Sequence, residues 1–239
     1  MLSRLRLDFA SVVDNLRDFG FMNAAHDVAV RAANHFVYLR FLMGVVITEP
    51  GERPAELAYG HGFADCDRLL AIAHDPIYEM SHPFIHEAFA KGDHCYAIWD
   101  DDQLASYGWY SDGPTFMTED LVVRFDPRYA YMYKGFTHPR YRGQRLHAAG
   151  MSLALQSYLD QGRLGLVSYV ESTNFSSLKS CYRMGYRDFG RIAIVQAFDR
   201  FAIRCSQGCD AYGFTVREAG PPSSAPTPAG PILDPPTVA

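Results

Sequence analysis

The spacing of apolar residues divides the chain into a helical first part and a second part in which strands and helices alternate. In the first part, apolar side chains recur every three or four residues, interrupted at Gly20 and at Glu49-Pro50-Gly51. The elements that this pattern predicts are helices over 5–16 and 24–37, a strand over 42–47, a loop over 51–62, and helices over 65–73 and 83–90.

From Asp93 onward the pattern changes to short apolar runs of strand length separated by polar turns. Strands are expected over 94–99, 104–110, 121–125, 129–136, 164–170, 191–198, 201–205 and 213–216. Helices are expected from 144 or 145 to 160, before Gly162, and over 175–183, before Gly185. The first two strands form a hairpin, and the whole order predicts a mixed α/β (α+β) sheet in a single domain with an N-terminal helical addition.

Composition narrows the classes of partner. The chain has 239 residues, 48% of them hydrophobic, which suffices for one sizeable core. Its net charge of −5 argues against a nucleic-acid partner, so any anion site must be a local concentration of positive charge. Residues 36–47 are apolar but too short to cross a bilayer, so no membrane span is expected.

The ends and the cysteines indicate the compartment and the boundaries. The first residues lack the apolar run of a signal peptide, and five irregularly spaced cysteines suit free thiols, so we expect a cytoplasmic protein. Residues 218–239 are rich in Pro, Ser, Ala and Gly and are expected to be disordered. The predicted organisation is therefore an N-terminal region over 1–92, a core over 93–217 and this tail.

Nine residues after the strand over 129–136 carry the main chemical signal: Thr137-His138-Pro139-Arg140-Tyr141-Arg142-Gly143-Gln144-Arg145. A strand, a basic turn with a glycine and the start of a helix form an anion site, because the glycine allows close backbone approach and the helix start presents free N–H groups. The GxxxxGK[ST] and GxGxxG patterns of nucleotide-binding loops are absent from the sequence.

With a second segment, this loop resembles the GNAT superfamily of acyl-coenzyme A N-acyltransferases. Arg140 and Gly143 fit the family's pyrophosphate loop. Asn174, Ser177 and Gly185-Tyr186 keep the spacing of a later family motif. The resemblance covers roughly 93–198 and implies a central, mostly antiparallel sheet flanked by helices, with acetyl- or another acyl-coenzyme A as co-substrate and no metal.

The resemblance also implies roles for individual residues. The residues expected to hold the coenzyme are Thr137, Arg140, Arg142, Gly143, Gln144, Arg145, Asn174 and Ser177. The candidates for acid–base chemistry are Glu171, His138 and Tyr182. Each has an ordinary structural alternative: a solvated acid for Glu171, packing or capping for His138, and core packing for Tyr182.

Two departures from the family pattern matter. Arg145 and His147 stand where small residues are usual, and either could crowd a pyrophosphate unless Arg145 binds it instead. Cys181 stands where the family often has a general-acid tyrosine, and a helical side chain at Tyr182 is rotated from it by about 100°.

The resemblance implies direct attack by the amine of a small-molecule or protein acceptor on the thioester of acetyl- or a longer acyl-coenzyme A. The aromatic residues of 1–92 would help to shape the acceptor pocket, and a homodimer is compatible with the sequence. The alternatives left open are a non-catalytic acyl-coenzyme A-binding or regulatory domain and an unrelated nucleotide-binding α/β domain. His82 and His86, four residues apart, lack the further ligands that a metal site needs.

Overall fold

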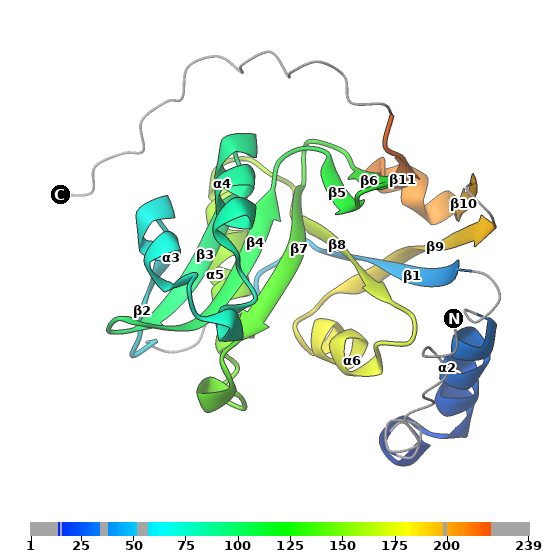
Figure 1. Cartoon of the computed structure of the whole chain (residues 1–239), viewed down its shortest axis with the longest axis horizontal. Coiled ribbons are helices and arrows are strands. Elements are labelled where there is room, and N and C mark those ends of the chain that lie inside the picture. The colour runs from blue at the N-terminus through cyan, green and yellow to red at the C-terminus, as the bar shows by residue number, and fades with distance from the viewer. Residues whose placement is uncertain (1–13, 15, 34–37, 52–56, 198–199, 221–239) are drawn as a thin grey trace.

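The sheet of this protein is built from strands that come from all parts of the chain. The computed structural model describes residues 14, 16–33, 38–51, 57–197 and 200–220 (Figure 1). The eight-stranded sheet has the order β10-β9-β1-β8-β7-β4-β3-β2. Its strands are β1 (Tyr38–Ile47), β2 (Gly60–Phe63), β3 (His94–Asp100), β4 (Gln103–Ser111), β7 (Ala130–Thr137), β8 (Leu166–Glu171), β9 (Arg187–Ala197) and β10 (Arg200–Cys205).

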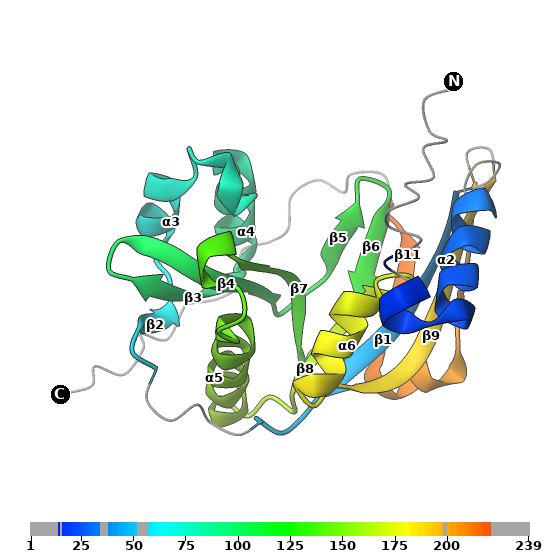
Figure 2. The same ribbon diagram turned by 90° about the horizontal axis from the view of Figure 1, so that it is seen from below.

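Helices cover both faces of this sheet. One face carries α5 (Leu146–Asp160) and α6 (Phe175–Arg183), whereas α3 (Cys66–Ile72) and α4 (His82–Lys91) lie on the other face, over β3 and β4 (Figure 2). Helix α2 (Phe21–Ala33) lies at the far end beside β1, and short 3-10 turns are η1 (Pro76–Tyr78), η2 (Pro139–Tyr141) and η3 (Gln207–Tyr212). No helix in the described residues is long and apolar enough to cross a membrane.

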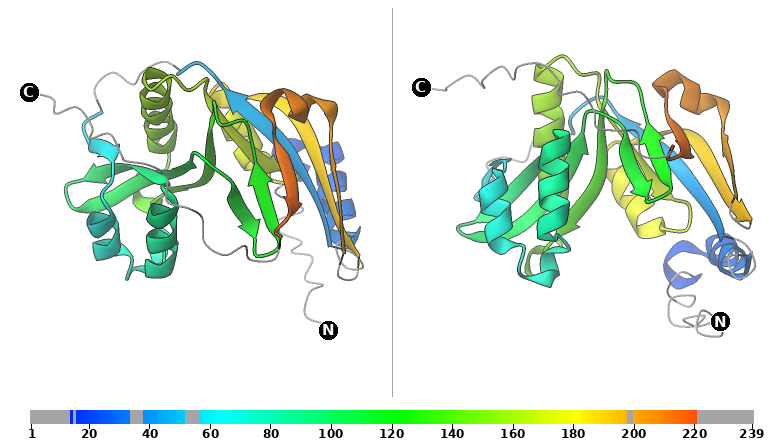
Figure 3. Two further views of the ribbon diagram at one scale, coloured as in Figure 1. Left: turned by 90° about the horizontal axis from the view of Figure 1, so that it is seen from above. Right: turned by 45° about the horizontal axis from the view of Figure 1, so that its top comes forward.

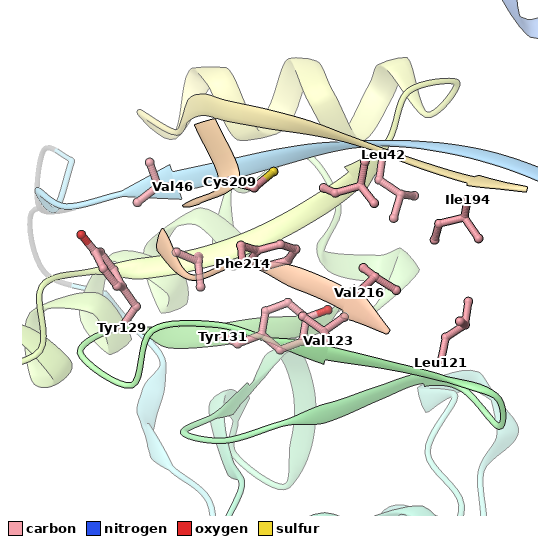
Figure 4. Close-up of a cluster of buried hydrophobic side chains, with 12 residues drawn as sticks. Leu42, Val46, Leu121, Val123, Tyr129, Tyr131, Ile194, Cys209, Phe214 and Val216 are labelled. Atoms are coloured by element: carbon pink, nitrogen blue, oxygen red, sulfur yellow. The ribbon is translucent and has the colours of Figure 1, made fainter. Parts of the chain in front are cut away.

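A second, three-stranded sheet covers the remaining part of one face. It has the order β11-β6-β5, from β5 (Thr115–Thr118), β6 (Leu121–Arg124) and β11 (Thr215–Glu218) (Figure 3). Leu121, Val123 and Val216 of this small sheet pack toward Leu42 and Ile194 of the large one (Figure 4). This cluster holds the C-terminal strands against the body of the domain.

Most predicted elements are confirmed, and two strands were missed. Residues 60–63 form β2, although 51–62 was predicted to be a loop, because Gly-His-Gly-Phe carries no apolar alternation and pairs only at the sheet edge. Strand β5 was also missed. The predicted helix over 5–16 falls mostly on residues outside the described ones, as does the tail from 221, so the disorder expected there stays a prediction.

The N-terminal region is part of the sheet as well as helical. Strand β1 spans ten residues and pairs antiparallel with both β8 and β9. Its second half is buried on both faces, with Val46 in one cluster and Val45 in the other. Residues before Asp93 therefore supply a central strand that links the last strands to the rest of the sheet.

Two neighbouring parallel strands separate halfway along their length. Strands β7 and β8 pair only through Ala130–Leu166 and Tyr131–Val167. Beyond that point, the Ser168 hydroxyl, rather than a backbone N–H, donates to the Met132 carbonyl at 2.7 Å. On its other side, β7 has a β-bulge in its pairing with β4: Trp109 pairs with Lys134 and Tyr110 with Met132, which leaves Tyr133 as an extra residue. The carboxyl ends of β7 and β8 consequently diverge, and the loops that follow them lead into α5 and α6.

Candidate functional site

An open pocket of about 1140 Å³ lies between the start of α5 and one side of α6. Its walls are the loop after β7, the first two turns of α5 and the side of α6 that faces them. Phe19, Gly51 and Leu57, from the N-terminal region, complete the lining. The pocket thus opens at the carboxyl ends of the two strands that separate.

The loop after β7 is held in place by its own aromatic residue. Tyr141 is buried, and its hydroxyl donates to Asp100 at 2.6 Å. That anchor leaves Arg142 to Arg145 exposed at the pocket mouth. Gly143 has φ +84°, and a Cβ added to it would meet no atom within 4 Å, so the backbone is open to a ligand there.

Arg145 occupies the residue directly before α5. Its φ of 58° places it in the left-handed region, which is costly for a residue with a side chain. It caps α5 without a side-chain hydrogen bond, so the N–H groups of the first helical turn have no cap from this residue. The least orthodox residue of the predicted motif therefore sits where the helix dipole favours an anion.

The wall formed by α6 was not predicted from the sequence. Ser176, Lys179, Ser180 and Arg183 line the pocket at positions i, i+3, i+4 and i+7 of the helix. This spacing places them on one face. The periodicity is visible in the sequence, but a polar stripe of this kind ordinarily marks a solvent-exposed face. The stripe alone therefore does not predict a binding site.

The pocket is positively charged, although the whole chain is negatively charged. Four cationic side chains line it, Arg142, Arg145, Lys179 and Arg183, and none of the described lining residues is Asp or Glu. The chain as a whole has a net charge of −5. Within the described residues, none of the four makes an ion pair. A site with this composition favours an anionic ligand.

Five of the eight residues predicted to hold the coenzyme line the pocket. They are Thr137, Arg142, Gly143, Gln144 and Arg145. Of the other three, Arg140 points its guanidinium at Gln103 (3.3 Å), and Asn174 caps α6 by accepting from the backbone N–H of Ser177 at 3.1 Å. Asn174 and Ser177 are therefore positioned by the capping of α6.

The three candidates for acid–base chemistry lie outside the pocket lining. His138 is buried, its ring packs against Tyr78 and Tyr141, and its Nδ1 accepts from the Arg140 backbone at 3.3 Å. Glu171, the last residue of β8, forms an ion pair with Arg40. The geometry of His138 is that of a packing and capping residue.

Tyr182 and Cys181 are also placed differently from a general acid in the pocket. The Tyr182 hydroxyl donates to Asp188 on β9 at 2.9 Å. Burial, with this hydrogen bond, raises the pKa of Tyr182 to about 12. Cys181 packs into the core beneath α6, and burial raises its pKa to about 11, so its thiol is neutral near pH 7.

His147, which could have crowded the pocket, is accommodated beside β7. It lines the pocket, and its ring lies against Gly135, which has no side chain to displace it. Burial lowers the pKa of His147, while a hydrogen bond to the Tyr107 backbone acts in the opposite direction. The imidazole is therefore neutral near pH 7 and adds to the wall without adding charge.

The described residues contain no group of three or more His, Cys, Asp or Glu that could hold a metal ion. His82 and His86 both fall in α4, where His82 is the first residue.

Comparison with protein families gives one match. The model of the acetyltransferase (GNAT) family matches residues 63–186, just over half of the chain. The match runs from the last residue of β2 to the residue before β9 and includes the loop after β7 and all of α6. No curated protein matches the chain.

Solved structures resemble the chain distantly. A GNAT-family protein from Novosphingobium aromaticivorans is 16% identical, with TM-score 0.45 over 66% of this chain and 64% of that one. An acetyltransferase from the GNAT family of Colwellia psychrerythraea is 13% identical, with TM-score 0.48 over 71% and 61%. A GCN5-related N-acetyltransferase from Sphaerobacter thermophilus is 8% identical, with TM-score 0.46 over 78% and 56%. The chain spans about three fifths of the length of these proteins.

Proposed function

Because this chain belongs to the acetyltransferase (GNAT) family, we propose that it transfers an acetyl or longer acyl group from acyl-coenzyme A to an amine. The observation that carries the proposal is the pocket at the start of α5, with four cationic side chains and no carboxylate among its described lining residues. The acceptor is a small molecule or a protein with a free amine, and the setting is the cytoplasm.

In this proposal the pyrophosphate of the coenzyme lies against Arg142 and Arg145 at the start of α5. A diphosphate needs hydrogen-bond donors and positive charge, and this segment offers both, since Gly143 leaves the backbone accessible and the helix presents unpaired N–H groups. Arg145 lines the same pocket, so its presence in place of a small residue suits an anionic coenzyme.

The acyl end would reach the opening between β7 and β8. There the strand β7 has no pairing partner on its β8 side beyond Tyr131, so a backbone N–H can polarise the thioester carbonyl. The N–H of His138 is already bonded to the Ala105 carbonyl at 2.9 Å. The donor in this proposal is therefore an earlier residue of β7, no later than Thr137.

Deprotonation of the acceptor is assigned to Glu171 or to water. Side chains alternate along β8, so Val170 faces α5 and α6, whereas Tyr169 and Glu171 face the other side of the sheet. A base role for Glu171 requires the acceptor to approach from that other side and its ammonium group to replace Arg40 as the partner of the Glu171 carboxylate. An acid role for Tyr182 would require its hydroxyl to leave Asp188. Much of the rate would come from positioning the two substrates together.

Binding is tested by titration calorimetry with coenzyme A and acetyl-coenzyme A, against ATP and NAD. We expect selective binding of the two coenzyme A compounds. Gly143→Glu should abolish it, because a carboxylate is placed at the pyrophosphate. Gly162→Glu is the matched control: Gly162 also has φ +84° and open space, but lies at the opposite end of α5. Absence of binding by the wild-type protein would overturn the proposal.

Catalysis is tested separately from binding. Release of free coenzyme thiol is followed with acetyl-coenzyme A and a panel of amines that includes polyamines, amino sugars and lysine peptides. Amine-dependent thiol release supports the transferase. Tight coenzyme binding without release over the whole panel and over several acyl chain lengths would instead assign a non-catalytic acyl-coenzyme A-binding domain.

A further inference from the structure

We propose that Lys179 and Arg183 on α6 bind the 3′-phosphate of coenzyme A, so that the protein discriminates against 3′-dephospho-coenzyme A. The inference rests on the proposed function, since it concerns the same ligand in the same pocket. It adds a second anion subsite on the wall opposite the loop, formed by residues that the sequence motif does not include.

The charges of the pocket exceed what a pyrophosphate requires. The bridging pyrophosphate of the coenzyme carries about two negative charges, which Arg142 and Arg145 can balance at the start of α5. Lys179 and Arg183 remain, and neither forms an ion pair within the described residues. A phosphate monoester carries about −1.5 to −2 charges near pH 7, which matches the two remaining cations.

Lys179 and Arg183 repel each other, and a bound phosphate would relieve that repulsion. Lys179 and Arg183 are four residues apart on one helix, and like charges at this spacing destabilise a helix. No carboxylate lines the pocket among the described residues, and neither cation forms an ion pair there. A phosphate between them converts the repulsion into two charge-assisted hydrogen bonds.

The N-terminal region helps to fix one of these side chains. Lys179 Nζ lies 5.7 Å from the ring centroid of Phe19, and Phe19 in turn packs on Phe175, with centroids 5.4 Å apart. Phe19 is itself part of the pocket lining. The aromatic ring therefore orients the ammonium at the rim, and Ser180, one residue later on the same wall, supplies a hydroxyl donor.

The dimensions of the two walls suit a ligand with separated phosphates. From Ser176 to Arg183 the α6 stripe extends about 10 Å at a rise of about 1.5 Å per residue. The loop cations lie on the other wall of the same pocket. A nucleotide whose 5′-pyrophosphate and 3′-phosphate leave the ribose in different directions can contact both walls together.

Titration calorimetry with coenzyme A and 3′-dephospho-coenzyme A tests the inference. We expect the wild-type protein to bind coenzyme A at least about tenfold more tightly, as for a desolvated charge-assisted contact. Lys179→Gln/Arg183→Gln should lower the affinity for coenzyme A to that for the dephospho compound and leave the latter unchanged. Arg142→Gln should weaken both ligands alike, and Arg217→Gln, an exposed residue of β11, should change neither.

The outcomes separate this inference from the proposed function. Equal wild-type affinities for the two compounds would overturn the 3′-phosphate subsite while leaving coenzyme binding in place. An equal loss for both ligands in the double variant would also overturn it. Binding of neither compound would overturn both proposals. Circular dichroism of each variant shows that α6 is intact before the affinities are compared.

Discussion

The imidazole of His147 fills the space in which a side chain at Gly135 would lie. A Cβ at position 135 would come within 2.5 Å of His147 Cε1 and 3.0 Å of Nε2. Gly135 is on β7 and His147 is in the first turn of α5, so the missing side chain is what allows the helix to start close to the strand. The wall of the pocket depends on this pair.

Gly135→Ala should destabilise the fold by about 1–3 kcal/mol, the usual cost of overpacking. Urea unfolding followed by circular dichroism measures the change. Gly113→Ala is the control, since a Cβ there meets nothing within 4 Å, and its effect should stay within about 0.5 kcal/mol. Removing the imidazole as well, in Gly135→Ala/His147→Ala, should give less destabilisation than the sum of the single variants. A strictly additive result would contradict the contact.

The same imidazole predicts a pH dependence of stability. Burial lowers the pKa of His147 below its ordinary value of 6.5, so the folded state favours the neutral form. The stability this provides is present above pH 6.5 and is lost as the pH falls through the lower folded-state pKa. We expect His147→Gln to flatten the acid side of the curve of unfolding free energy against pH. An unchanged slope below pH 6.5 would show that His147 titrates alike in both states.

Arg145 combines a side chain that is proposed to bind the coenzyme with a strained backbone. Its φ of 58° is favoured by glycine and costs other residues roughly 1 kcal/mol. Arg145→Gly should therefore be more stable than Arg145→Ala by about 1 kcal/mol in thermal or urea unfolding. Both variants lack the guanidinium, so calorimetry should show the same loss of coenzyme affinity in each. A difference in affinity would mean that backbone geometry, rather than charge, controls binding.

The elements near the site were predictable where local signals and packing agree. The helix over 175–183 was predicted with its observed bounds, because Asn174 is a good N-cap and Gly185 ends the segment, and both act through local backbone geometry. Strand β2 was missed because Gly60 and Gly62 hide any alternation, and only its pairing with β3 makes it a strand. The local sequence does not show that β3 will lie beside this segment.

The site itself was predictable only along the loop. Arg142 to Arg145 are contiguous, so a motif describes them, whereas the α6 wall depends on how two helices face each other. Glu171 likewise appeared as a free carboxylate, because its partner Arg40 is 131 residues away in the chain and reaches it only through the pairing of β1 with β8. The sequence pattern alone therefore does not predict that Arg40 and Glu171 are in contact.

Tyr182→Phe should retain acyl transfer within about twofold of the wild type. Its hydroxyl donates to Asp188 and lies outside the pocket lining, so its removal costs a partly exposed hydrogen bond of about 1 kcal/mol or less rather than a step of the reaction. Thiol release at saturating acetyl-coenzyme A gives kcat, and urea unfolding gives the stability change. A fall in kcat of tenfold or more would place the phenol at the departing thiolate.

Glu171→Gln separates the two bases that the proposed mechanism allows. Removal of a general base ordinarily lowers the rate by about 10²–10⁴-fold, and the substitution keeps the shape of the side chain and a hydrogen-bond acceptor for Arg40. We expect kcat for amine-dependent thiol release to fall at least about a hundredfold, with the calorimetric affinity for coenzyme A unchanged, because Glu171 lies outside the pocket proposed to bind the coenzyme. Glu87→Gln, an exposed carboxylate on α4, is the control. Unchanged turnover in Glu171→Gln would assign the proton to water, and a parallel loss of coenzyme affinity would show that the Arg40 pair instead supports the site through the sheet.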